Sequence, residues 1–118
     1  MIDKLLGLQN QLRVYHWQTK SYSEHKALGK AYDALDGSID SFVENWIGVH
    51  GTVSVEGGIR MTLLDYASNG VTNLLDQATE FFTTGELGSA LNGNTDLANI
   101  RDDMLGTINH TKYLLTLK

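Results

Sequence analysis

Residues 21–48 read SYSEHKALGKAYDALDGSIDSFVENWIG, and this stretch decides the fold. Its apolar side chains recur at intervals of three and four, at Leu28, Tyr32, Leu35, Ile39, Phe42 and Trp46. Such spacing places them on one face of an amphipathic helix. Ser21 followed by Glu24 has the form of a capping box, so we expect the helix to begin there and to stop near Gly48.

A second amphipathic helix precedes this one, from about residue 2 to residue 19. Its apolar stripe consists of Leu5, Leu8, Leu12 and Tyr15. Only residues 20–22 separate the two helices, and so short a connection forces them into an antiparallel hairpin. His16 and His25 should then lie close together at one end of the hairpin.

The remainder of the chain predicts three more helices. Residues 49–58 are either a loop or a weak hairpin, and we favour the loop because an isolated hairpin is marginally stable. The helices are expected at residues 59–67, at residues 71–82 and from residue 94 or 95 onward, with a loop at residues 85–93. We therefore predict an all-α four-helix bundle, one domain over residues 1–118, with a short helix in the middle crossover.

The composition fits a globular protein, with 42% hydrophobic and 19% charged residues. A net charge of −5 and the lack of a Lys/Arg cluster argue against a nucleic-acid partner. The absence of cysteine excludes disulfides and thiolate metal sites. No apolar run approaches the length of a membrane span, and the N-terminus lacks the apolar region of a signal peptide. We therefore expect a cytoplasmic protein with no membrane partner.

Three acidic residues, Asp36, Asp40 and Glu44, follow one another at intervals of four and so share one face of the predicted helix. No basic residue lies three or four positions from Asp40 or Glu44, so each like-charge pair costs roughly a few tenths of a kcal/mol. A bound cation would remove this repulsion, and carboxylates with imidazoles suit iron, manganese or zinc. The other interpretation is an acidic helix face that is simply solvated.

The histidines that could complete such a site lie too far away in the same chain. His25 precedes Asp40 by fifteen positions, which corresponds to roughly 22 Å along a helix. An antiparallel copy of the helix, packed across a two-fold axis, would bring the two groups together at two sites between subunits. The chain also lacks any Glu-x-x-His pair, which excludes the di-iron site built inside a single bundle.

A purely structural role explains His16 better than it explains His25. His25 lies in the first turn of its helix, where the helix dipole disfavours a cation but not a neutral, metal-binding imidazole. His16, beside a tryptophan at a helix end, is equally well explained as a capped or core residue.

One series of residues, in order and largely in register, resembles the signature of the Dps proteins (DNA protection during starvation), the mini-ferritins of the ferritin-like superfamily: His16-Trp17, His25, Tyr32, Asp40 and Glu44. The resemblance is specific over residues 12–46 and architectural elsewhere. It implies a ferritin-like bundle with ferroxidase activity, which oxidises Fe(II) with hydrogen peroxide or oxygen and stores ferric iron. It also implies self-association as a two-fold dimer and a dodecameric shell.

Carried over residue by residue, the resemblance implies that His16 and His25 bind iron from one subunit, and that Asp40 and Glu44 bind it from the partner. Trp17 would lie near the site, where the family's tryptophan takes up stray oxidising equivalents. Iron, as Fe2+ and Fe3+, is the implied metal, and zinc or manganese would be substitutes.

The chain departs from the family in the same region. The gap between His16 and His25 is three residues shorter, and Gly29 stands where the family often has a carboxylate. Asp36 is a candidate to replace that carboxylate. These departures favour an alternative function, a structural or assembly bundle without metal chemistry. A further alternative is a bundle that binds a partner or small molecule through residues 49–58.

Overall fold

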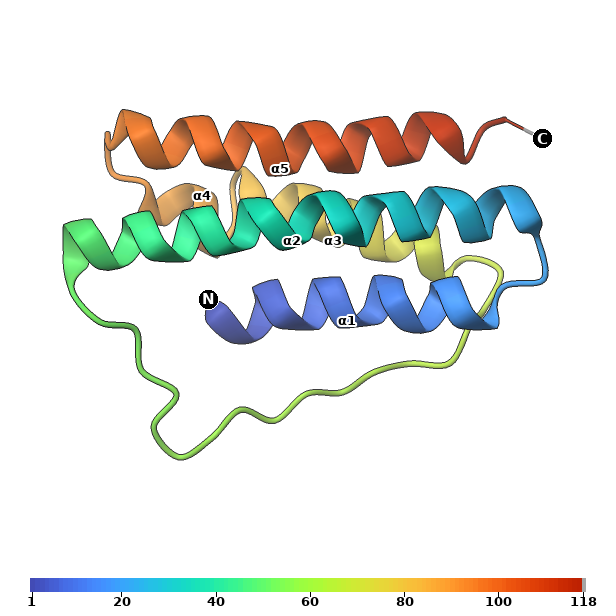
Figure 1. Cartoon of the computed structure of the whole chain (residues 1–118), viewed down its shortest axis with the longest axis horizontal. Coiled ribbons are helices and arrows are strands. Elements are labelled where there is room, and N and C mark those ends of the chain that lie inside the picture. Colours follow the sequence, from blue (N-terminus) through green and yellow to red (C-terminus); the bar gives the residue numbers. More distant parts are fainter. Residues whose placement is uncertain (118) are drawn as a thin grey trace.

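The structure, a computed structural model, describes residues 1–117, which form five helices and no β-strand (Figure 1). In chain order the helices are α1 (Ile2–Gln18), α2 (Tyr22–His50), α3 (Gly70–Phe82), α4 (Glu86–Ala90) and α5 (Thr95–Leu114). The four longer helices form a bundle, and α4 is a short turn between α3 and α5. The predicted all-α four-helix bundle is therefore confirmed.

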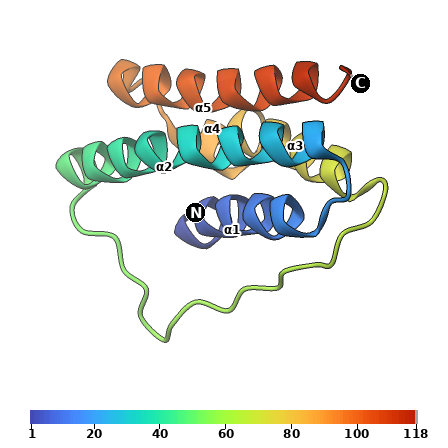
Figure 2. The ribbon, with the colours of Figure 1, turned by 45° about the vertical axis from the view of Figure 1, so that its right-hand side comes forward.

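The bundle contains one long connection. Figures 1 and 2 show that α1 and α2 form an antiparallel hairpin, after which residues 51–69 run back along the molecule. As a result α3 runs parallel to α2, and α5 returns in the direction of α1. None of the described helices combines the length and the apolarity that crossing a bilayer requires.

The apolar stripe of α2 forms the centre of the core, because α2 packs against both α1 and α5. Leu28, Leu35 and Phe42 are fully buried, and Tyr32 and Trp46 are half-buried against the same core. The other helices contribute fully buried side chains of their own: Leu5, Leu12, Leu75, Phe82, Leu97, Met104 and Ile108. This distribution confirms the predicted inner face of α2 and leaves its acidic face outside.

The start of α2 is stabilised by side chains on both sides of the connection. The Ser21 hydroxyl accepts the backbone N–H of Glu24 at 3.2 Å, which is half of the predicted capping box. The Glu24 carboxylate accepts the Thr19 hydroxyl at 2.7 Å instead of turning back to the Ser21 N–H. At the other end, Gly51 has a φ of 87°, a left-handed conformation that favours glycine, and α2 ends there.

The middle crossover differs from the prediction. Residues 59–67 were expected to form a short helix, and that expectation is wrong, because the backbone there is extended. The loop predicted in place of a weak hairpin is present from Gly51 onward. The only short helix among residues 1–117 is α4, which lies where a loop was expected and buries Leu87 completely.

Two glutamines of α1 explain the extended crossover. The Gln11 side-chain amide donates to the Leu64 carbonyl at 2.8 Å and accepts the Leu64 N–H at 2.7 Å. Gln18 likewise accepts the Tyr66 N–H at 2.7 Å and donates to the Asp65 carboxylate at 2.8 Å. These side chains satisfy backbone groups that a helix would otherwise have paired. Residues 60–67, held in this way, are called the strap below.

Replacing Gln11 by methionine should release the strap while keeping the length of the side chain. The net free energy of one such hydrogen bond, about 1 kcal/mol, corresponds to roughly fivefold faster hydrogen exchange at the Leu64 amide. Hydrogen exchange followed by NMR checks this, with Asn109→Met, an exposed amide on α5, as the control. Equal protection of Leu64 in both variants would contradict the role of Gln11.

Candidate metal-binding site

The α1–α2 connection places His16 and His25 side by side, as the hairpin predicts. Their rings stack with centroids 3.8 Å apart and planes 13° apart. The Tyr32 ring meets His16 edge-on at 5.3 Å, and the Tyr22 ring lies 6.4 Å from His25. The two imidazoles are therefore held within a small cluster of aromatic side chains.

Each imidazole is fixed by the backbone of the other histidine. Nδ1 of His16 lies 2.6 Å from the carbonyl oxygen of His25, and Nδ1 of His25 lies 2.7 Å from the carbonyl oxygen of His16. A carbonyl oxygen only accepts hydrogen bonds, so both Nδ1 atoms must carry the proton. In the neutral rings the lone pair is then on Nε2. Metal-binding histidines are commonly oriented by this kind of N–H to carbonyl bond.

The stacking restricts how the two rings can bind a metal. The lone pair of an imidazole nitrogen lies in the plane of its ring, and a coordinated ion lies about 2.1 Å from the nitrogen in that plane. Because the two ring planes are nearly parallel, no single point lies in both planes at bonding distance from both Nε2 atoms. In this arrangement each imidazole can serve a separate ion, whereas a single shared ion would require one ring to turn.

Gly29 makes the stacked arrangement possible. A Cβ atom at this position would lie only 2.8 Å from Cε1 and 3.1 Å from Nδ1 of His16. The carboxylate that the resemblance expects at position 29 would therefore displace the His16 ring.

The carboxylates do not join the histidines within one chain. Asp40 and Glu44 are exposed on the outer face of α2, and neither forms a hydrogen bond or ion pair within residues 1–117. Asp36 accepts a hydrogen bond from Nε2 of Gln9 at 2.9 Å, so it is tied to α1. Across this part of the chain, no three His, Asp or Glu side chains lie close enough to hold a metal ion.

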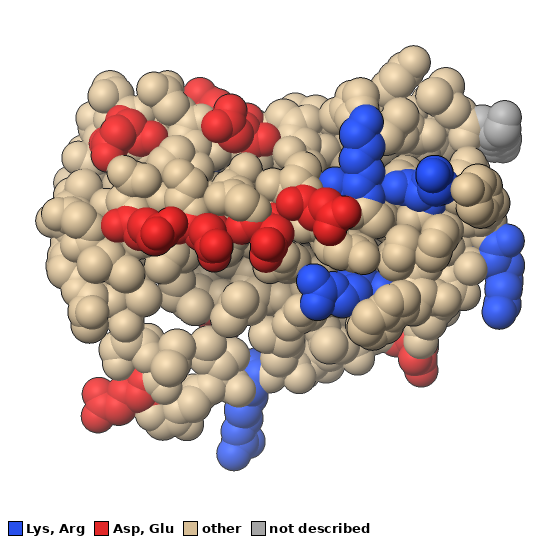
Figure 3. Space-filling model, viewed as in Figure 1, with Lys and Arg blue, Asp and Glu red and all other residues tan. Residues whose placement is uncertain are grey.

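The charges of α2 are segregated along its length. Figure 3 shows a row of acidic side chains along the half of α2 that leads to its C-terminus, with basic side chains gathered around its beginning. The exposed residues of the two groups are Asp33, Asp36, Asp40 and Glu44, and Lys20, Lys26 and Lys30. Lys26 and Lys30 also line the groove that contains His16 and His25.

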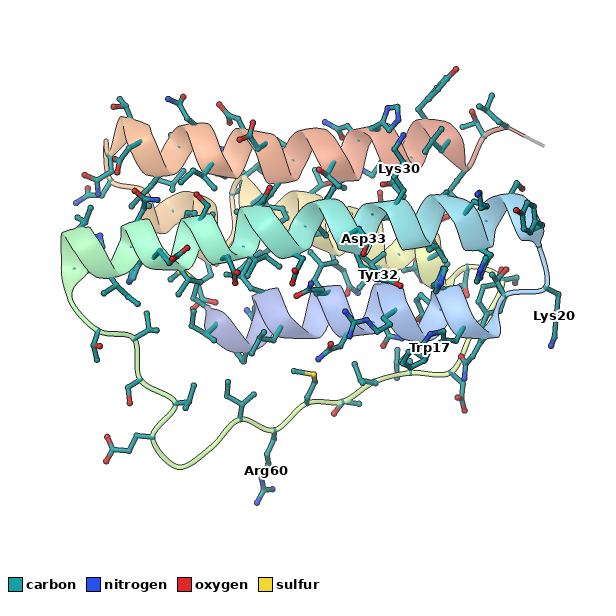
Figure 4. The ribbon with its side chains drawn as sticks, viewed as in Figure 1. Trp17, Lys20, Lys30, Tyr32, Asp33 and Arg60 are labelled. Carbon is teal, nitrogen blue, oxygen red and sulfur yellow. The ribbon has the colours of Figure 1, made fainter. Side chains whose placement is uncertain are left out.

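Trp17 lies apart from the stacked rings in the single chain. Its side chain is 67% exposed and, in Figure 4, lies on the side of α1 that faces the strap. The resemblance places this tryptophan near a metal site. In one chain its neighbour in sequence, His16, instead contacts His25 and Tyr32.

Sequence reasoning missed the positioning residue of this site. It identified Gly29 only as a missing carboxylate, although the glycine is what admits the His16 ring. Outside this site, sequence reasoning also missed the role of Gln11 and Gln18 in holding the strap, since a glutamine that binds a backbone far away in sequence leaves no periodic signal. The shortened connection was the one available hint that the two imidazoles are closely packed.

Comparison with known proteins places the chain in a family. The sequence model of a family of unknown function, DUF5856, matches residues 16–115. The chain belongs to this family. A similar protein is the uncharacterized 14.6 kDa protein in the mobD-ri intergenic region of Enterobacteria phage T4, which is 28% identical over 123 residues covering 98% of this chain and 88% of the phage protein. No solved structure matches the chain. The matched region begins at His16 and includes every candidate ligand.

Replacing Gly29 by alanine should push the His16 ring out of the stack while leaving α2 helical, because alanine favours helix more than glycine does. The downfield Nδ1–H signals of the two histidines, measured by NMR, should shift or disappear. Gly37→Ala is the matched control, because a Cβ at that position of α2 meets nothing within 4 Å. Unchanged histidine signals in the Gly29 variant would show that the glycine does not position the ring.

Proposed function

We propose that the protein is a mini-ferritin-like ferroxidase whose iron sites form between two copies of the chain. His16 and His25 of one copy and Asp40 and Glu44 of the other supply the ligands. The observation that supports this best is the orientation of the imidazoles, which bind the backbone through Nδ1 and leave Nε2 free. The carboxylates of Asp40 and Glu44, without partners within residues 1–117, provide the matching oxygen ligands.

The charge distribution of α2 supports an antiparallel pair. Lys26, Lys30 and the row of carboxylates lie beyond the first and last turns of α2, where the helix dipole acts, so the dipole does not account for their order along the helix. A two-fold axis near Asp33 lies about midway between His25 and the Asp40/Glu44 pair. Such an axis would set the basic half of one α2 against the acidic half of the other, and would complete both metal sites.

The ligand set suits iron oxidation. Imidazole nitrogens bind Fe(II), and carboxylate oxygens stabilise Fe(III), which favours loss of an electron. The two stacked imidazoles would bind two separate Fe(II) ions, which together can give up two electrons. Hydrogen peroxide suits such a pair as the oxidant, because cleavage of its O–O bond takes up two electrons. Each of two Fe(II) ions would lose one electron, and two protons would complete two water molecules. Zinc or manganese could occupy the same ligands without this reaction.

Fold topology and the resemblance extend the proposal. A four-helix bundle with one long crossover is the connection typical of ferritin-like folds. By the resemblance, dimers would assemble into a dodecameric shell that keeps ferric iron inside and protects the cytoplasm against oxidative stress. Trp17, exposed in the single chain, would take up stray oxidising equivalents once a partner brings the second half of the site.

The alternative is an assembly bundle without metal chemistry, and one observation favours it. Lys26 and Lys30 share a groove with the two imidazoles and outnumber its one carboxylate, Asp33, so the net positive charge repels a metal cation. This alternative predicts a dimer of the same size in which iron oxidation is no faster than in buffer. In the proposed dimer the partner's acids would offset the lysines.

The rate of Fe(II) oxidation, followed by absorbance with peroxide and then with air, tests the proposal. Glu44→Ala should lower the rate of the parent protein to the buffer rate, because each site loses a carboxylate ligand. Asp103→Ala, which removes an exposed acid on α5, should leave the rate unchanged. Circular dichroism should show equal helix content in all three proteins. A parental rate in Glu44→Ala, or no rate above buffer in the parent, would reject the site.

A further inference from the structure

The two sides of the bundle are packed differently. α2 and α5 contact each other along their length, whereas α1 and α3 make few contacts. A cavity of about 670 Å³ remains between α1 and α3, and the strap covers part of it. This volume is within the range of pockets that hold small molecules, roughly 300 to 1,000 Å³.

The inner wall of this cavity is apolar. Leu8 and Ala78 line it from the bundle core, and Leu74 and Phe81 present half-buried side chains. The strap adds Met61, whose sulfur accepts a hydrogen bond from the Asn10 amide at 3.3 Å. A ligand in the cavity would cover apolar surface that the single chain leaves partly in water.

Most of the charges around the cavity are already paired with one another. The N-terminal ammonium contacts Asp3 at 3.0 Å and Glu86 at 3.3 Å, and Lys4 contacts Glu86 at 3.6 Å. The hydrogen bond from the ammonium lowers the pKa of Asp3, which keeps this pairing ionised. Arg60 points away from the bundle in Figure 4. The lining as a whole contains four carboxylates, Asp3, Asp65, Glu80 and Glu86, against the two cations Lys4 and Arg60, so its net charge is negative and disfavours an anionic ligand.

Uncharged polar groups remain available on α3. The side-chain amides of Asn73 and Gln77 line the cavity, are exposed, and form no hydrogen bond within residues 1–117. An amide can both donate and accept, so it recognises a group of the same kind. We infer that this cavity binds an uncharged small molecule with an apolar body and an amide-like group.

Gly7 offers a variant that fills the cavity without disturbing the fold. This residue of α1 lines the cavity, and a Cβ at its position meets nothing within 4 Å. Leucine at position 7 would therefore extend into the open space, and it favours helix over glycine. Gly48→Leu is the matched control, since Gly48 also meets nothing within 4 Å and lies on α2, away from the cavity.

Benzamide is a suitable probe because it combines an apolar ring with an amide. In a titration followed by NMR of the backbone amides, saturable shifts are expected at Leu74 and Phe81. Gly7→Leu should weaken binding by about tenfold or more, and Gly48→Leu should leave it unchanged. Shifts that do not saturate in the parent protein, or equal binding by Gly7→Leu, would overturn the inference.

The ligand class is tested with two related probes. Benzoate, which carries a charge, and toluene, which lacks the amide, should both bind more weakly than benzamide. Benzoate binding as tightly as benzamide would show that the cavity does not select an uncharged ligand. The iron oxidation rate should not change in Gly7→Leu, so the failure of one proposal leaves the other standing.

Discussion

The rest of the structure depends on one constraint: α2 is a long, rigid helix. This helix spans 29 residues and buries its apolar stripe against α1 and α5, so it cannot bend enough to bring its two ends together. His25 and Asp40 consequently stay roughly 22 Å apart within a chain. The same burial leaves the charged face of α2 outside the bundle. A metal site made from these residues therefore requires a second helix.

Much of the hairpin could be predicted from the sequence because it depends on local periodicity. Leu28, Leu35 and Phe42 recur at helical spacing and are buried for that reason. The proximity of His16 and His25 followed from the short connection alone. The strap could not be predicted, since its extended backbone depends on two α1 side chains, each more than forty residues away in sequence. The contact between Gly29 and His16 likewise became visible only in three dimensions.

The strap connects the two regions for which functions are proposed. Its Tyr66 ring packs edge-on against Tyr15 at 5.9 Å. A hydrogen bond to Glu24, together with burial and the nearby negative charge, raises the pKa of Tyr66. The Glu24 carboxylate in turn accepts a hydrogen bond from Thr19, and the Glu24 backbone N–H donates to Ser21, the residue that caps α2 next to the histidines. Because the pKa is raised, this bond contributes at neutral pH and is lost only as the pH rises through the raised pKa of the tyrosine. The hydrogen bonds of Gln18 to Asp65 and Tyr66 attach the strap to the end of α1, next to the connection that positions the imidazoles.

Complementation between two inactive variants tests the shared site most directly. One variant carries His16→Ala and His25→Ala, and the other carries Asp40→Ala and Glu44→Ala. After random mixing by refolding in equal amounts, about a quarter of the interfacial sites should combine intact histidines with intact carboxylates. Each variant alone should oxidise Fe(II) at the buffer rate, and the mixture should recover about a quarter of the parental rate. A mixture as inactive as its two components would contradict a site built from two chains.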